Sequence, residues 1–215
     1  MRDREYDITL DALADSREGK LSEAQAAEVR DALAASAEIR AVAPFPAAEL
    51  PAALARREIV PGVLVNNAGY GLLGEFVTLA VEDELAMVRL NVLAVVELTK
   101  RLLPGILAAG PEGGVLNVAS TAAYQPGPYM ARYYATKAFV LSWSEALAVE
   151  LAGRTRVTCL CPGPVLTGFQ ERAGISTGIP LFSGLVPLLG VGAVARIGLR
   201  AFRRGRAVAV AGFVN

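Results

Sequence analysis

The run Val63-Leu64-Val65-Asn66-Asn67-Ala68-Gly69 largely decides the fold that this sequence predicts. Its first three residues are apolar and include two β-branched valines, which favour a strand. The next four are polar or small, which is typical of a turn that ends a buried strand. Two later runs have the same design, because Val115–Ala119 stops at Ser120 and Val157–Cys161 stops at Pro162-Gly163. We therefore predict three buried strands, each followed by a polar or glycine-bearing turn.

Helical patterns separate these strands. Residues Glu82–Ala109 and Tyr133–Leu151 place apolar side chains at helical spacing, and Ala207–Val210 is a further strand candidate. Alternating strands and helices predict an α/β fold with an open parallel sheet. In such sheets ligands bind beyond the carboxyl ends of the strands, which is where the three turns would meet.

The composition excludes several classes of function. The 215 residues are 53% hydrophobic, as expected when helices cover both faces of a buried sheet. The 21 basic and 21 acidic residues balance, so nothing favours binding to nucleic acid. Histidine is absent, which removes Ser-His-Asp hydrolysis and most zinc sites, and we predict no metal. The only cysteines, Cys159 and Cys161, are predicted to be reduced core residues of a cytoplasmic protein.

The first 58 residues differ in composition from the rest of the chain. Residues 1–58 are charged and alanine-rich, with an amphipathic helix predicted over Leu21–Val42 and a short helix over Ala52–Glu58. We predict an atypical helical segment at 1–58 and the α/β portion at 59–215. The charged N-terminus shows no signal peptide. Residues 173–195 lack charge, but their glycines and prolines indicate a flap or loop rather than a membrane-spanning helix.

A proton-transfer pair is suggested by Tyr133 and Lys137, which lie four residues apart and so share one helix face. A nearby ammonium favours the phenolate and lowers the pKa of a tyrosine, which would suit it to exchange a proton with a carbonyl or alcohol oxygen. Ser120, at a strand end, could hold the same oxygen. Tyr134 is the competing tyrosine, three residues from Lys137.

Five motifs in order resemble those of the short-chain dehydrogenase/reductases, a Rossmann-fold family of nicotinamide-dependent oxidoreductases. They are Asn66-Asn67-Ala68-Gly69, Asn91 within Leu90-Asn91-Val92, Ser120 after Asn117-Val118-Ala119, Tyr133 with Lys137, and Pro162-Gly163-Pro164-Val165-Leu166-Thr167. The resemblance covers roughly Ile59 to Asn215. Linked motifs in the family's order are a far more specific signal than any one of them.

The resemblance implies a role for each matched residue. Tyr133 would be the general acid/base, Ser120 would orient the substrate oxygen, and Asn91 would support a proton-relay water. Lys137 would lower the pKa of Tyr133 and hold the nicotinamide ribose. The implied cofactor contacts are Asn66, Ala68, Gly69, Asn91, Tyr133, Lys137, Pro162, Gly163, Val165 and Thr167. The cofactor would be NADP or NAD, with NADP slightly favoured.

One element of the family pattern is missing. The family opens with a strand and a T-G-x-x-x-G-x-G turn, whose backbone amides bind the cofactor's pyrophosphate. Before Asn66 this sequence has only Gly19 and Gly62, and neither lies in such a pattern. The resemblance thus implies a Rossmann-like, doubly wound parallel sheet that is truncated or rearranged, incomplete at its N-terminal strand-helix-strand unit. The strand at Val63 would then have an unpaired edge.

The leading functional hypothesis is an NAD(P)-dependent oxidoreductase that interconverts a carbonyl and an alcohol. The apolar side chains of residues 181–189 indicate either a lipophilic substrate or a subunit contact. With the five arginines of residues 196–206, this region could also touch a membrane surface. By the resemblance, a homodimer is the default assembly. The alternatives are an inactive remnant that acts only as a binding or dimerisation partner, and a membrane-surface or regulatory protein.

Overall fold

The structure is a computed structural model that describes residues 50–165, 169, 173–174 and 189–212. Its elements, in order, are α3 (Leu50–Arg56), β1 (Val63–Asn66), α4 (Val81–Val88), η2 (Arg89–Ala94), α5 (Val95–Ala108), η3 (Gly110–Glu112), β2 (Gly114–Val118), η4 (Thr121–Tyr124), α6 (Ala131–Glu150), β3 (Arg156–Pro162), α8 (Val191–Arg203) and β4 (Val208–Ala211). All four predicted strands are present, with bounds shifted by one residue at most ends. The short predicted helix before β1 is present as α3.

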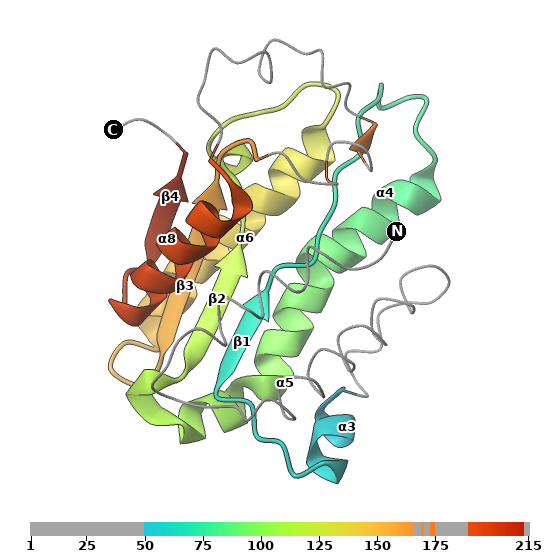
Figure 1. Ribbon diagram of the computed structural model, residues 1–215. Coiled ribbons are helices and arrows are strands. Elements are labelled where there is room, and N and C mark those ends of the chain that lie inside the picture. Colours follow the sequence, from blue (N-terminus) through green and yellow to red (C-terminus); the bar gives the residue numbers. More distant parts are fainter. Residues whose placement is uncertain (1–49, 166–168, 170–172, 175–188, 213–215) are drawn as a thin grey trace.

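The four strands form one parallel sheet in the order β1-β2-β3-β4 (Figure 1). The register pairs Asn66 of β1 with Asn117 of β2, and Asn117 with Cys159 of β3. Because the strands are parallel and in register, their carboxyl ends meet at one edge of the sheet. The predicted α/β, Rossmann-like parallel fold is confirmed.

Helices cover both faces of this sheet. On one face, α6 packs against Cys159 and Cys161, and α5 packs against Val115. On the other face, α8 packs against Leu116 and Leu160. Neighbouring residues of β2 and β3 therefore point to opposite layers, as the two-residue repeat of a strand requires. This arrangement explains why both strands are apolar along nearly their whole length.

A single long helix crosses the molecule from Val81 to Ala108. It was predicted as one helix over Glu82–Ala109, and α4, η2 and α5 follow one another without a break. The middle segment, η2, has π-helical hydrogen bonding. Such one-turn insertions are frequent at functional sites, and this one contains Asn91.

The sheet has an open edge at β1. Among the described residues, β1 pairs only with β2, which agrees with the expected loss of a neighbouring strand. Helix α3 lies beside β1, where Leu50 and Leu54 pack against a cluster that includes Leu64. The side chain of Val63 remains 40% exposed on the opposite face of the strand.

Both cysteines are buried and free, so they are the core residues that were predicted. The Sγ atoms of Cys159 and Cys161 are 3.9 Å apart. Residues 1–49, including the predicted helix Leu21–Val42, and residues 175–188 of the uncharged stretch lie outside the described residues. None of the helices in the described part of the chain combines the length and apolar character needed to cross a bilayer.

Candidate active site

The carboxyl edge of the sheet brings together residues from four distant parts of the sequence. Gly69 follows β1, Asn91 lies in η2, and Lys137 lies in α6. A Cβ atom at Gly69 would lie 3.0 Å from Asn91 Oδ1 and 3.4 Å from Lys137 Nζ. The glycine therefore permits a close approach that a larger residue would disturb. Three of the residues expected in the site are neighbours in space.

Ser120 and Tyr133 form the centre of this group. Ser120 follows β2 and caps the short helix η4, where its Oγ accepts a hydrogen bond from the Ala122 amide at 3.1 Å. Tyr133 lies in the first turn of α6 and is only 9% exposed. Ser120 Oγ also donates a long hydrogen bond of 3.5 Å to the Pro162 carbonyl, and its hydroxyl acts on the neighbouring Tyr133 phenol to lower that group's pKa. One substrate oxygen could therefore contact both hydroxyls.

The surroundings of Tyr133 control its ionisation. Burial raises the pKa of Tyr133 to about 12, and the Ser120 hydroxyl only partly offsets this effect. An apolar cluster around the ring explains the loss of solvent. It contains Met87 and Ala122, with Tyr70, Leu72, Met130, Tyr134 and Phe169 packed against it. The expected lowering of the tyrosine pKa by Lys137 is not found in this structure, because burial is the largest influence and the groups that act on the phenol are Ser120 and Tyr134.

Lys137 is buried as well. Its Nζ lies 5.8 Å from the centroid of the Tyr133 ring and donates a hydrogen bond of 2.9 Å to the Val118 carbonyl. Burial lowers the pKa of Lys137 to about 8, although the nearby thiols of Cys159 and Cys161 act in the opposite direction. An ammonium group has three N–H donors, so donors remain for a ligand after the bond to Val118.

Asn91 of η2 connects the turn after β1 to helix α6 through hydrogen bonds. Its Oδ1 accepts from the Tyr70 amide at 3.2 Å, and its Nδ2 donates to the Tyr70 carbonyl at 2.9 Å. The same Nδ2 donates to Thr136 Oγ1 at 3.1 Å. With 1% of its surface exposed, Asn91 thus holds β1, η2 and α6 in fixed relation. Its part in a proton relay stays a prediction.

A second polar network lies beneath the site and was not predicted. Asn66 Nδ2 donates to Thr99 Oγ1 at 3.1 Å and to Asn117 Oδ1 at 2.8 Å. Asn117 Nδ2 in turn donates to Ser144 Oγ at 2.9 Å. The network joins α5, β1, β2 and α6. A signal was present, because Asn117 interrupts an otherwise apolar strand and needs a buried partner there.

The remaining cofactor residues line the same edge where they are described. Ala68 is exposed beside Gly69, while Pro162, Gly163 and Val165 are half-buried at the end of β3. The Gly163 amide donates to the Ala211 carbonyl at 2.6 Å, which ties the ends of β3 and β4 together. Thr167 lies outside the described residues.

These residues fit one half of a nicotinamide cofactor. Ammonium and hydroxyl donors at the sheet edge, beside the open Ala68 position, match the chemistry of a ribose and a carboxamide. No glycine-rich turn for a pyrophosphate is found among the described residues or in the sequence before Asn66.

Known proteins resemble this chain in sequence. Curated relatives include the ketoacyl reductase HetN of Nostoc sp., 34% identical over 54% of this chain and 43% of that protein. The 3-ketodihydrosphingosine reductase of Bacteroides thetaiotaomicron is 38% identical over 53% of this chain and 42% of that protein. This chain thus spans less than half the length of these two curated relatives.

Solved structures agree with the fold. A short-chain dehydrogenase from Sphingobium yanoikuyae in complex with NADPH has a TM-score of 0.67 at 29% identity, covering 78% of this chain and 63% of that one. A bulky-bulky ketone specific alcohol dehydrogenase from Comamonas testosteroni has a TM-score of 0.60 at 26% identity, covering 76% and 59%.

The family model of the short chain dehydrogenases matches residues 16–176, which is more than half of the chain. This match begins well before Ile59, where the recognisable motifs start. It contains the turn after β1, Asn91, Ser120, and the pair Tyr133 and Lys137. The chain therefore belongs to the short-chain dehydrogenase/reductase family.

Proposed function

We propose that this chain carries the catalytic part of an NAD(P)-dependent oxidoreductase that interconverts a carbonyl group and an alcohol. The observation that supports this most directly is the convergence of Ser120, Tyr133 and Lys137 at the sheet edge. The Ser120 hydroxyl acts on the Tyr133 phenol to lower its pKa, and Lys137 Nζ lies 5.8 Å from the centroid of the Tyr133 ring.

In the proposed reaction, Ser120 donates a hydrogen bond to the substrate oxygen and holds it beside the Tyr133 hydroxyl. Tyr133 gives its proton to that oxygen during carbonyl reduction and takes a proton from it during alcohol oxidation. A bound nicotinamide supplies hydride chemistry at the substrate carbon. Lys137 and Gly163 would hold its nicotinamide and ribose groups, while the turn with Ala68 and Gly69 would pack beside its adenosine portion. We propose NADP in preference to NAD, supported by the NADPH complex of the Sphingobium enzyme.

Carbonyl reduction is the proposed direction near neutral pH. Burial raises the pKa of Tyr133 to about 12, so its phenol stays protonated and ready to act as an acid. Alcohol oxidation needs the phenolate and should accelerate as pH rises toward 10, by up to about tenfold per unit. Initial rates in both directions between pH 6 and 10 test this. An oxidation rate that is flat with pH would contradict it.

A bulky, lipophilic ketone is the proposed substrate class. The apolar cluster around Tyr133 includes Leu72, Met130 and Phe169, and Leu72 belongs to the loop that follows β1. The names of two similar proteins point the same way, since one reduces 3-ketodihydrosphingosine and the other is specific for ketones with two bulky groups. Turnover of a ketone series graded in substituent size would show rates rising with apolar bulk.

The decisive experiment is a calorimetric titration of the purified chain with NADPH and then NADH. Binding at micromolar strength, about −8 kcal/mol, is expected if the described residues suffice to hold the cofactor. Tyr133→Phe should bind with similar strength but lose about 10²–10⁴-fold in turnover. Tyr134→Phe is the matched control, because it removes the neighbouring hydroxyl and should keep activity. Absence of binding to folded protein would overturn the proposal.

We also propose that the protein is a cytoplasmic homodimer, with neither nucleic acid nor metal as a partner. Exposed apolar side chains on its helices support an association surface. They include Leu85, Leu93, Phe139 and Val149, of which Val149 is 78% exposed. Peripheral contact of the arginine-rich helix α8 with a membrane remains part of the proposal, and liposome sedimentation tests it. A monomer by light scattering would contradict the dimer.

A further inference from the structure

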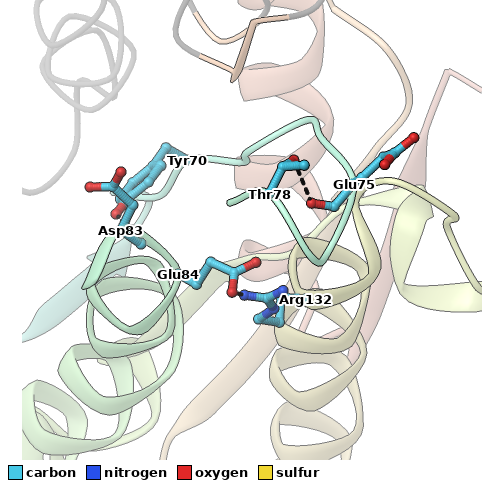
Figure 2. A network of polar contacts seen from close by, with 6 residues as sticks. All are labelled: Tyr70, Glu75, Thr78, Asp83, Glu84 and Arg132. Carbon is cyan, nitrogen blue, oxygen red and sulfur yellow. Dashed lines mark hydrogen bonds and ion pairs between the residues drawn. The ribbon is translucent and has the colours of Figure 1, made fainter. Parts of the chain in front are cut away.

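A buried ion pair lies beside the proposed active site, between the first turns of α4 and α6. Glu84 of α4 faces Arg132 of α6, and the two side chains form a salt bridge (Figure 2). Their side chains are 8% and 24% exposed, respectively. Removing such charges from water is costly, so a pair at this depth is weak evidence for added stability. Because the pair joins α4 to α6 next to Tyr133, its position suggests that it holds this part of the structure in place.

Arg132 makes a second contact, with the loop that follows β1. Its guanidinium carbon lies 4.6 Å from the centre of the Phe76 ring, in a cation–π arrangement. Phe76 belongs to the 70–80 loop, which we define as residues 70–80, and its side chain is 73% exposed. An arginine is well suited to this double contact because its planar group can pair with a carboxylate and stack on an aromatic ring at once.

The 70–80 loop runs directly against the Tyr133 ring. A Cβ atom at Gly71 would lie 2.8 Å from Met130 Cε and 3.2 Å from Tyr133 Cδ2, so the loop backbone touches the aromatic group. The Gly74 amide donates a hydrogen bond of 2.9 Å to the Tyr129 carbonyl. The placement of this loop therefore limits where the Tyr133 ring can lie.

The start of the loop is anchored separately from Arg132. Tyr70 is bonded through its backbone to Asn91, and its hydroxyl donates to the Asp83 carbonyl at 3.2 Å. Later in the loop, Thr78 Oγ1 bonds only to the Glu75 carbonyl of the same loop (Figure 2). The stack of Phe76 on Arg132 is thus a connection between the outer part of the loop and helix α6.

We propose that Arg132 and Glu84 are positioning residues that hold the 70–80 loop against Tyr133. Glu84 fixes the guanidinium, the guanidinium holds Phe76, and the loop then confines the position of the Tyr133 ring. The carboxylate also offsets the unfavourable placement of a cation near the N-terminus of α6. The consequence for turnover rests on the function proposed above, whereas the consequence for the loop does not.

The test combines hydrogen exchange with kinetics on the full chain. Arg132→Ala removes both contacts, Arg132→Lys keeps the ion pair but not the planar stack, and Phe76→Ala removes only an exposed ring. The matched control is Arg101→Ala, which breaks the exposed Glu97–Arg101 pair of α5. Exchange is followed in peptides from the 70–80 loop and, for comparison, from β2 and β3.

The expected result is faster exchange of the loop in Arg132→Ala and Phe76→Ala, with β2 and β3 unchanged. Turnover in Arg132→Ala should fall about tenfold, more than KM rises, because small misplacements of a reacting group are costly. Arg132→Lys should recover part of both effects. Loop exchange equal to that of Arg101→Ala, or equal acceleration throughout the sheet, would overturn the proposal. Exchange decides it even if Tyr133→Phe keeps full turnover and the enzymatic function fails.

Discussion

At the residue scale, burial has more influence than charge pairing on the titration of the site. The spacing of Tyr133 and Lys137 correctly suggested that the two side chains are neighbours, and their Nζ-to-ring distance is 5.8 Å. It also suggested a lowered tyrosine pKa, yet burial raises the pKa of Tyr133 to about 12 and lowers that of Lys137 to about 8. Spacing along a helix carries no information about solvent, so the sign of these shifts could not be predicted.

The buried ammonium of Lys137 should make stability depend on pH. Its pKa is about 8 when folded and about 10.4 in an unfolded chain. Between these values the unfolded state binds more protons, so the free energy of unfolding rises with pH, by about 3 kcal/mol in total. That contribution is lost again as pH falls through 8. Chemical denaturation of wild type and Lys137→Met between pH 7 and 10.5 measures the difference.

In Lys137→Met this rise should disappear, while the titration of Tyr133 remains in both proteins. Lys100→Met is the control, because Lys100 is exposed on α5 and should leave the slope unchanged. Identical slopes in wild type and Lys137→Met would show that the ammonium is not buried as described.

At the scale of elements, polar side chains on the strands and helices set the geometry of the site. The periodicity of the sequence predicted one helix from Glu82 to Ala109, but not the π-helical turn η2 that contains Asn91. A π turn adds a residue without changing the apolar pattern much, so periodicity alone does not reveal it. The network of Asn66, Asn117 and Ser144 likewise depends on register between elements, which is known only once they pack.

The Asn117 side chain should be important for stability. Asn117→Ala removes the acceptor for Asn66 and a donor to Ser144, and it leaves a small cavity in a fully buried strand. The expected loss is about 2–4 kcal/mol in the free energy of unfolding. Denaturant melts measure it. Asn67→Ala, at an exposed position in the turn, should change stability by less than about 0.5 kcal/mol. Equal effects of the two substitutions would contradict the network.

At the scale of the whole molecule, the sheet ends at β1 with one edge unpaired among the described residues. Leu64 is covered by α3 and α5 on one face, whereas Val63 on the other face is 40% exposed. An open edge with an apolar face promotes association between chains. The sequence before Asn66 contains no glycine-rich turn of the family pattern.

We predict that Val63→Lys reduces concentration-dependent association of the purified protein. The substitution places a charge at an exposed position of the edge strand, and the free energy of unfolding should change by less than about 0.5 kcal/mol. Sedimentation velocity at several concentrations measures the association. Val65→Lys is the contrasting variant, because Val65 packs against the core on the same face and the substitution should destabilise the fold. Unchanged association in Val63→Lys would rule out this edge as the site of contact.

The sequence by itself determined the α/β class, the parallel sheet, the order of strands and helices, and the family. It did so because strand and helix periodicity and short motifs are local properties of the chain. The tertiary structure alone decided the burial of Tyr133 and Lys137, the hydrogen bond of Asn91 to Tyr70, and the contacts of Arg132 with Glu84 and Phe76. These features join residues separated by tens of positions, and desolvation and close contact arise only when such segments pack together.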